Sequence, residues 1–128
     1  MKMPIVLVLT AALWLPAAAL AHGEKIGPNG GVVEDAGKYH VELVLKNDGL
    51  RAFVTDAKDV KVDTKGAAAT AIVLVGKEKA TVKLVPAGGN ALAAGGKFDA
   101  GAGAKVVVSL TLQGQPAAQA RFTLPAKK

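Results

Sequence analysis

The 128-residue sequence contains no cysteine. This absence excludes disulfide bonds, thiolate metal ligands, cysteine nucleophiles and blue-copper centres, so the core must be held by packing alone. Serine occurs only at Ser109, in the middle of a predicted strand, which leaves a Ser–His–Asp triad without a positioned nucleophile. Nucleophile elbows, zinc-protease helices and paired-carboxylate signatures are also missing. We therefore expect a protein that is not an enzyme.

Aromatic residues make up only 4% of the chain, and arginine occurs only at Arg51 and Arg121. The net charge of +6 comes from lysines that are dispersed along the sequence. Nucleic-acid binding needs basic clusters interleaved with stacking aromatics or forked arginine contacts. We therefore expect no nucleic-acid partner, and the positive charge indicates solubility, with at most weak adhesion to anionic envelope surfaces.

The only long hydrophobic run lies at the start of the chain. Lys2 precedes an apolar run over 5–15 that only Thr10 interrupts, and Pro16 follows. Ala19 and Ala21 then supply the small residues of an A-x-A cleavage site, which completes the pattern of a secretory signal peptide over residues 1–21. The run is shorter than the roughly 20 residues of a membrane span. We expect a cleaved signal peptide, an exported periplasmic protein and no stable membrane span after cleavage; an uncleaved anchor is the alternative.

Cleavage after Ala21 would leave residues 22–128 as one domain that begins with His22. Cleavage after Ala19 is also chemically acceptable and would leave Leu20 and Ala21 in front of this histidine.

The rest of the chain alternates between apolar and polar residues, as strands do. Tyr39, Val41, Leu43 and Leu45 fall on one face of such a strand, and His40, Glu42 and Val44 fall on the other. Turn residues, such as Asp48-Gly49, separate the alternating segments. We expect strands over 39–45, 50–55, 60–63, 71–75, 80–85, 91–93, 104–112 and 118–124.

This spacing predicts an all-β protein, a single small β-sandwich of immunoglobulin-like or related type, over residues 22–128. A small barrel, and a helical turn within the alanine-rich segment 66–75, are the alternatives. The predicted core consists of Val41, Leu43, Leu45, Val82, Leu84, Val106, Val108, Leu110 and Phe122. Gly27–Gly31 should form an ordered turn that brings the amino terminus back toward the strand that carries His40.

Metal binding is the chemistry for which the sequence offers residues. His40 and Glu42 are two apart on a strand, so they lie on the same face roughly 7 Å apart. His22, if it is the mature amino terminus, offers an α-amine and an imidazole together, and such nitrogens suit Cu(II) or Zn(II). Glu24 and Asp99 are further oxygen donors. The plain alternative is that both histidines are simply solvated.

The segment "HGEKIGPNGGVVEDAGKYHVELVL", residues 22–45, carries a resemblance. It is similar to the Gly-Pro-(His/Asn)-Gly-Gly…His-x-Glu-Leu module of periplasmic adaptor subunits of heavy-metal efflux pumps, and of small stand-alone exported proteins. The matching positions are Gly27, Pro28, Asn29, Gly30, Gly31, His40, Glu42 and Leu43. The resemblance implies an envelope protein associated with metal handling, whose partner would be a heavy-metal efflux system or another envelope protein.

Three hypotheses follow. The first is a periplasmic accessory protein that binds copper or zinc through His22, His40 and Glu42. The second is an interaction module, a β-sandwich that docks an envelope partner without a metal. The third, a histidine-brace copper oxidase, is the weakest, because Tyr39 falls on the wrong face to serve as its axial group.

Overall fold

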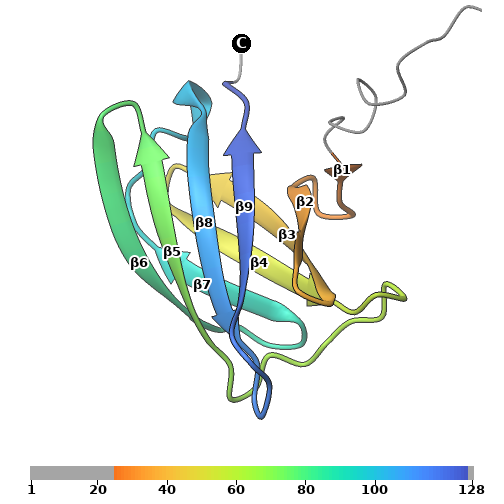
Figure 1. Ribbon diagram of the computed structural model, residues 1–128. Coiled ribbons are helices and arrows are strands. Elements are labelled where there is room, and N and C mark those ends of the chain that lie inside the picture. The colour runs from red at the N-terminus through yellow and green to blue at the C-terminus, as the bar shows by residue number, and fades with distance from the viewer. Residues whose placement is uncertain (1–24, 127–128) are drawn as a thin grey trace, which may run out of the picture.

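A computed structural model describes residues 25–126 as an arrangement of antiparallel strands (Figure 1). The predicted signal peptide and His22 lie outside these residues. The described strands are β1 (Lys25–Ile26), β2 (Val32–Ala36), β3 (Tyr39–Lys46), β4 (Gly49–Thr55), β5 (Ala68–Val75), β6 (Glu78–Pro86), β7 (Ala91–Gly95), β8 (Ala104–Thr111) and β9 (Ala118–Leu124). One short 3-10 turn, η2 (Ala100–Ala102), precedes β8.

The strands form one sheet in the order β1-β2-β3-β4-β7-β6-β5-β8-β9. The sheet curls until β2 contacts β9, so its two halves face each other across the core. Figure 1 shows the half made of β6, β5, β8 and β9 crossing the half made of β7, β4, β3 and β2. The all-β prediction is confirmed, and the two layers of the expected sandwich come from a single continuous sheet.

The predicted strands agree with the structure wherever alternation is strict, and 118–124 has the bounds of β9. The prediction of a strand over 60–63 is wrong, because this stretch makes only an isolated bridge between Thr55 and Lys61. The sequence analysis did not predict β1 and β2. Neither has an alternating apolar pattern of its own, and they form by pairing, β1 with β2 and β2 with β3. No helix of the described residues is long and apolar enough to cross a membrane.

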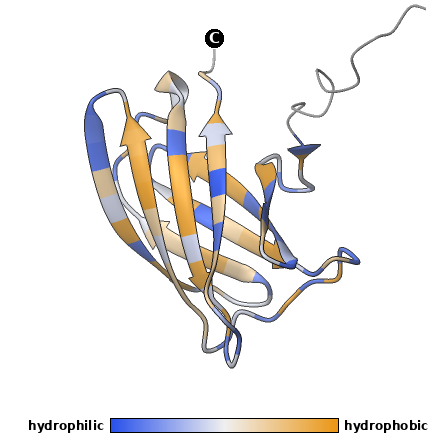
Figure 2. Ribbon diagram, in the orientation of Figure 1, coloured by the Kyte–Doolittle hydropathy of each residue, from blue (hydrophilic) through white to orange (hydrophobic). Residues whose placement is uncertain are grey.

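The core lies between the two halves of the sheet. All the predicted core residues are buried except Val82, which is partly buried and packs against the others. The most buried of the larger side chains come from both halves of the sheet, and Figure 2 shows the apolar bands on both halves. They are Leu43, Leu84, Leu92, Leu110, Val41, Val54, Val73, Val106 and Val108.

Small residues line the seam where β2 meets β9. Ala36 and Ala120 are fully buried. Gly37 has a φ of +58°, and a Cβ there would lie 3.4 Å from the Cβ of Ala118. The curl of the sheet therefore depends on short side chains at this seam, because larger ones would hold the two strands apart.

Leu110 tests the assignment of the buried face. Because this side chain is 2% exposed, Leu110→Ala should lower the free energy of unfolding in urea by about 2–5 kcal/mol through lost burial and a residual cavity. Leu74→Ala is the matched control, since Leu74 is 41% exposed, and it should cost less than about 1 kcal/mol. Equal effects of the two substitutions would mean that the inward face is misassigned.

Candidate functional site

A groove of about 940 Å³ lies on the outer face of β2, β3 and β4. Its floor is made by outward-facing strand residues, among them Val33, His40, Glu42 and Phe53. The segment 25–29 borders the groove, and so does the loop after β4, through Ala57, Asp59 and Lys61. Two of the three predicted metal ligands, His40 and Glu42, therefore lie in one groove.

Glu42 is buried although it occupies the face that the alternation predicts to be polar. Its side chain is 4% exposed, because the 27–31 turn covers it. Oε2 accepts hydrogen bonds from the backbone N–H groups of Asn29 at 2.9 Å and Gly31 at 2.8 Å. Oε1 accepts one from the Asn29 side-chain amide at 3.0 Å. These three donors take up most of the acceptor positions of a carboxylate, which number about four.

The glycines of the 27–31 turn make this contact possible. The turn is closed by hydrogen bonds from the Gly27 N–H to the Gly31 carbonyl at 2.8 Å and from the Gly30 N–H to the Gly27 carbonyl at 3.0 Å. A Cβ at Gly27 would overlap the carboxyl group of Glu42, and one at Gly31 would overlap the backbone of Leu43. The prediction of an ordered turn at these residues is confirmed, and the sequence reasoning missed that Glu42 is what anchors it.

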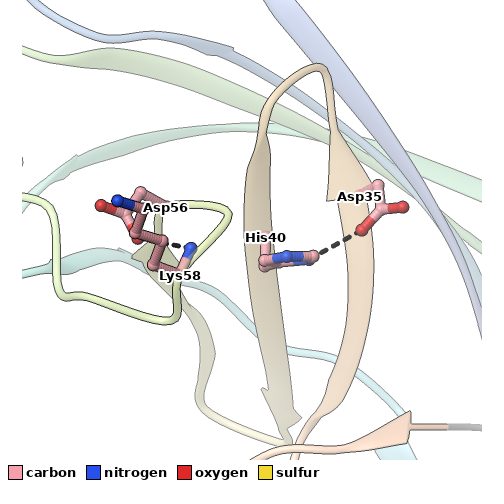
Figure 3. Close-up of polar contacts among 4 residues, drawn as sticks. All are labelled: Asp35, His40, Asp56 and Lys58. Atoms are coloured by element: carbon pink, nitrogen blue, oxygen red, sulfur yellow. Dashed lines mark hydrogen bonds and ion pairs between the residues drawn. The ribbon is translucent and has the colours of Figure 1, made fainter.

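His40 has a different environment. Its Nδ1 lies 2.7 Å from Oδ1 of Asp35, its cross-strand neighbour on β2 (Figure 3). The histidine side chain is 25% exposed and the aspartate side chain 76% exposed. The contact fixes the orientation of the imidazole ring, and the described residues provide no hydrogen-bond partner for Nε2. The sequence analysis did not single out Asp35; its position opposite His40 follows from the register of β2, a strand that was missed.

The other proposed donors are not gathered at this groove. His22 and Glu24 lie outside the described residues, and Asp99 sits in the loop before η2, away from the groove lining. Within residues 25–126 no group of three or more histidine or acidic side chains is placed to hold a metal ion.

The loop that borders the groove is held by Asp56. Its Oδ1 accepts a hydrogen bond from the backbone N–H group of Val60 at 3.0 Å. It accepts a second one from the backbone N–H group of Lys58 at 2.8 Å, which Figure 3 shows. Both bonds lower the pKa of Asp56 below its ordinary value of 3.8, because they favour the charged carboxylate, and the bond from Val60 has the larger effect. Asp59 at the tip of the loop has a φ of +62°, the only positive φ of a non-glycine residue in the described chain.

No protein-family model, curated protein or solved structure matches this chain. The proposed function therefore depends on the residues and contacts of the groove itself.

Glu42→Gln tests the anchoring role of the carboxylate. The glutamine side chain has nearly the size of glutamate, but it has only one acceptor oxygen for the three N–H donors of the turn. The free energy of unfolding should therefore fall by about 1–3 kcal/mol. Amide hydrogen exchange at Asn29 and Gly31 should speed up at the same time. Glu34→Gln is the control, because Glu34 is exposed on the neighbouring strand. Unchanged exchange at Asn29 and Gly31 in Glu42→Gln would contradict the assignment.

The Asp56 loop should respond to pH. The pKa of Asp56 is lower in the folded protein than in the unfolded chain. The stabilisation that its carboxylate gives to the folded loop is therefore fully present above pH 3.8 and is lost as the pH falls through the folded pKa. An NMR titration should show the Asp56 carboxyl carbon and the Lys58 and Val60 amides shifting together below pH 3.8. Asp56→Asn should abolish the shared transition in the two amides. Titration of Asp56 at or above its ordinary value would be evidence against these hydrogen bonds.

Proposed function

We propose that this protein is an exported, non-enzymatic accessory protein that binds Cu(II) or Zn(II) at the groove on β2, β3 and β4. The ligands are His40 and the histidine that becomes the amino terminus after cleavage at Ala21, His22. The resemblance of residues 22–45 to heavy-metal efflux adaptors supports a role in metal efflux or resistance in the periplasm.

The observation that carries the proposal is the contact between His40 and Asp35. Metal-binding histidines commonly donate one ring N–H to a carboxylate, which fixes the tautomer and makes the other nitrogen a better ligand. Nδ1 of His40 lies 2.7 Å from Asp35. This arrangement leaves Nε2 as the ligand atom, on a side chain that lines the groove.

Chain length favours the participation of His22. Lys25 lines the same groove as His40, and β1 is separated from β3 by β2 alone. Two strand spacings amount to about 9.6 Å. The three residue steps from Lys25 back to His22 span at most about 10–11 Å. The imidazole and α-amine of His22 are therefore within chain reach of Nε2.

Glu42 takes a supporting role in this proposal rather than the ligand role that the sequence suggested. Its carboxylate already accepts three hydrogen bonds from the 27–31 turn. By anchoring this turn, Glu42 sets the position of β1, which lies immediately before it in the chain. Loss of Glu42 should therefore weaken metal binding indirectly, through the placement of the amino terminus.

The groove also accommodates the second hypothesis, an interaction module without a metal. Ile26 and Val60 are large apolar side chains near it that are 63% and 57% exposed. A partner that covers them would need no metal ligand, and the titration below distinguishes the two possibilities.

Calorimetric titration with Cu(II) and Zn(II) tests the metal site. The chain starting at His22 should bind one ion, and binding should weaken with falling pH because protons compete for the ligand nitrogens. Acetylation of the α-amine, His40→Ala, or a chain that retains Leu20 and Ala21 should each weaken binding. Asp35→Asn should weaken it by about 10-fold to 100-fold, as loss of such outer partners does.

The control is Asp48→Asn, which removes an exposed carboxylate in the β3–β4 turn. Its affinity should equal that of the parent. Equal, weak binding in the parent, acetylated and His40→Ala forms would refute the metal site and favour the interaction module.

A further inference from the structure

The outer face of the other half of the sheet has a charge distribution unlike the rest of the molecule. Four cations extend from it, Lys79 and Lys83 on β6, Lys105 on β8 and Arg121 on β9, and all four are exposed. The only acidic residue in β5, β6, β8 and β9 is Glu78. Glu78 pairs with Val75, whose alternation places it with the inward-facing residues. We call the outer face of these four strands the basic face.

The strand register places apolar side chains between the cations. One row across the sheet runs Lys79, Leu74, Lys105 and Thr123, and the next runs Thr81, Ile72, Val107 and Arg121. A third row holds Lys83, Thr70, Ser109 and Gln119. Figure 2 shows hydrophilic bands on β6, β8 and β9 beside the apolar stretch of β5. On the basic face, Leu74 therefore lies between Lys79 and Lys105, and Ile72 and Val107 lie in the next row beside Arg121.

These cations are not neutralised by the protein itself. The only ion pair among residues 25–126 is the one between His40 and Asp35, on the opposite half of the sheet. Apart from Glu78, the acidic residues among 25–126 lie outside β5, β6, β8 and β9, in β2, β3 and the loops around 48, 56–63 and 99. The molecule therefore has a polarised charge distribution, and the unpaired positive side is an extended sheet face rather than a cleft.

We propose that the basic face binds the surface of an anionic phospholipid bilayer. The cations lie about 8–17 Å from one another by strand geometry, a spacing that suits several separate headgroup phosphates rather than one buried anion. Lysine side chains can extend their charged ends to phosphates while their methylene stems cover apolar surface. Leu74, which is 41% exposed and lies between Lys79 and Lys105, then contacts the interface between headgroups and acyl chains.

The apolar residues between the cations favour a bilayer over a soluble polyanion. A polysaccharide or an acidic protein segment would be attracted by the four charges alone. Binding to a bilayer would also be strengthened by burial of the apolar Leu74 side chain. This inference is independent of the metal site, which lies on the outer face of the opposite half of the sheet. Its failure would leave the metal proposal untouched, and the reverse also holds.

Vesicle co-sedimentation tests the proposal, with the chain recovered after export and EDTA present so that metal plays no part. The protein should bind vesicles of phosphatidylcholine mixed with phosphatidylglycerol and should not bind pure phosphatidylcholine. Each cation near an anionic bilayer contributes about a fivefold gain in affinity. The variant Lys79→Gln/Lys83→Gln/Lys105→Gln/Arg121→Gln should therefore lose nearly three orders of magnitude, about 600-fold, in partition coefficient.

The matched control is Lys38→Gln/Lys46→Gln/Lys65→Gln/Lys97→Gln, which removes the same charge from exposed positions outside the basic face. It should lose less than about fivefold. Leu74→Thr, which keeps every charge, should weaken vesicle binding several-fold but leave binding to heparin, a soluble polyanion, unchanged. All variants carry the same amino terminus, so any contribution of the first residues cancels.

Equal losses in the two fourfold variants would overturn the proposal, because binding would then follow net charge rather than this face. Binding to heparin without binding to anionic vesicles, or unchanged vesicle binding in Leu74→Thr, would also overturn it in favour of a polyanionic partner. Thermal unfolding of each variant establishes that the fold is intact before binding is compared.

Discussion

Both halves of one curled sheet pack their inward side chains into a single apolar interior, and the other features of the molecule depend on this packing. Without cysteine and with few aromatic residues, the chain fills this interior with alanine, valine and leucine. Small residues at the seam, including Ala36 and Ala120, allow β2 to approach β9. Larger residues at this seam would open the curl, and both outer faces, with the groove and the cations, would lose their positions.

Among residues 25–126, Glu42 is the only buried acidic side chain, and it is buried on the outer face of the sheet rather than in the core. A carboxylate removed from water is costly unless hydrogen bonds compensate. The 27–31 turn supplies three, two of them from backbone N–H groups. The need to satisfy Glu42 therefore fixes the turn, the turn fixes β1, and β1 completes the groove beside His40.

The sequence predicts much of this fold because strict alternation marks β3, β8 and β9, whose inward residues are buried as expected. It does not predict β2, because Glu34 and Asp35 interrupt the apolar pattern and the strand forms through pairing with β3. Val60 and Val62 alternate as strand residues do, yet only Thr55 bridges this stretch. For the site, alternation places His40 and Glu42 on one face, but it cannot show that a turn 11 to 13 residues earlier in the chain covers Glu42.

The two outer faces of the sheet differ because different outward-pointing residues form each of them, although both halves enclose the same interior. On β2, β3 and β4 the outward positions hold a histidine, acidic residues and Phe53, and the preceding segment folds over them to make a groove. On β5, β6, β8 and β9 the outward positions hold cations and short hydroxyl or apolar side chains, and no described segment covers them. A face bound to an anionic surface would leave the groove on the opposite side of the molecule exposed to the aqueous compartment. The proposed metal exchange at the groove and the proposed attachment through the basic face would therefore be sterically compatible in one small domain.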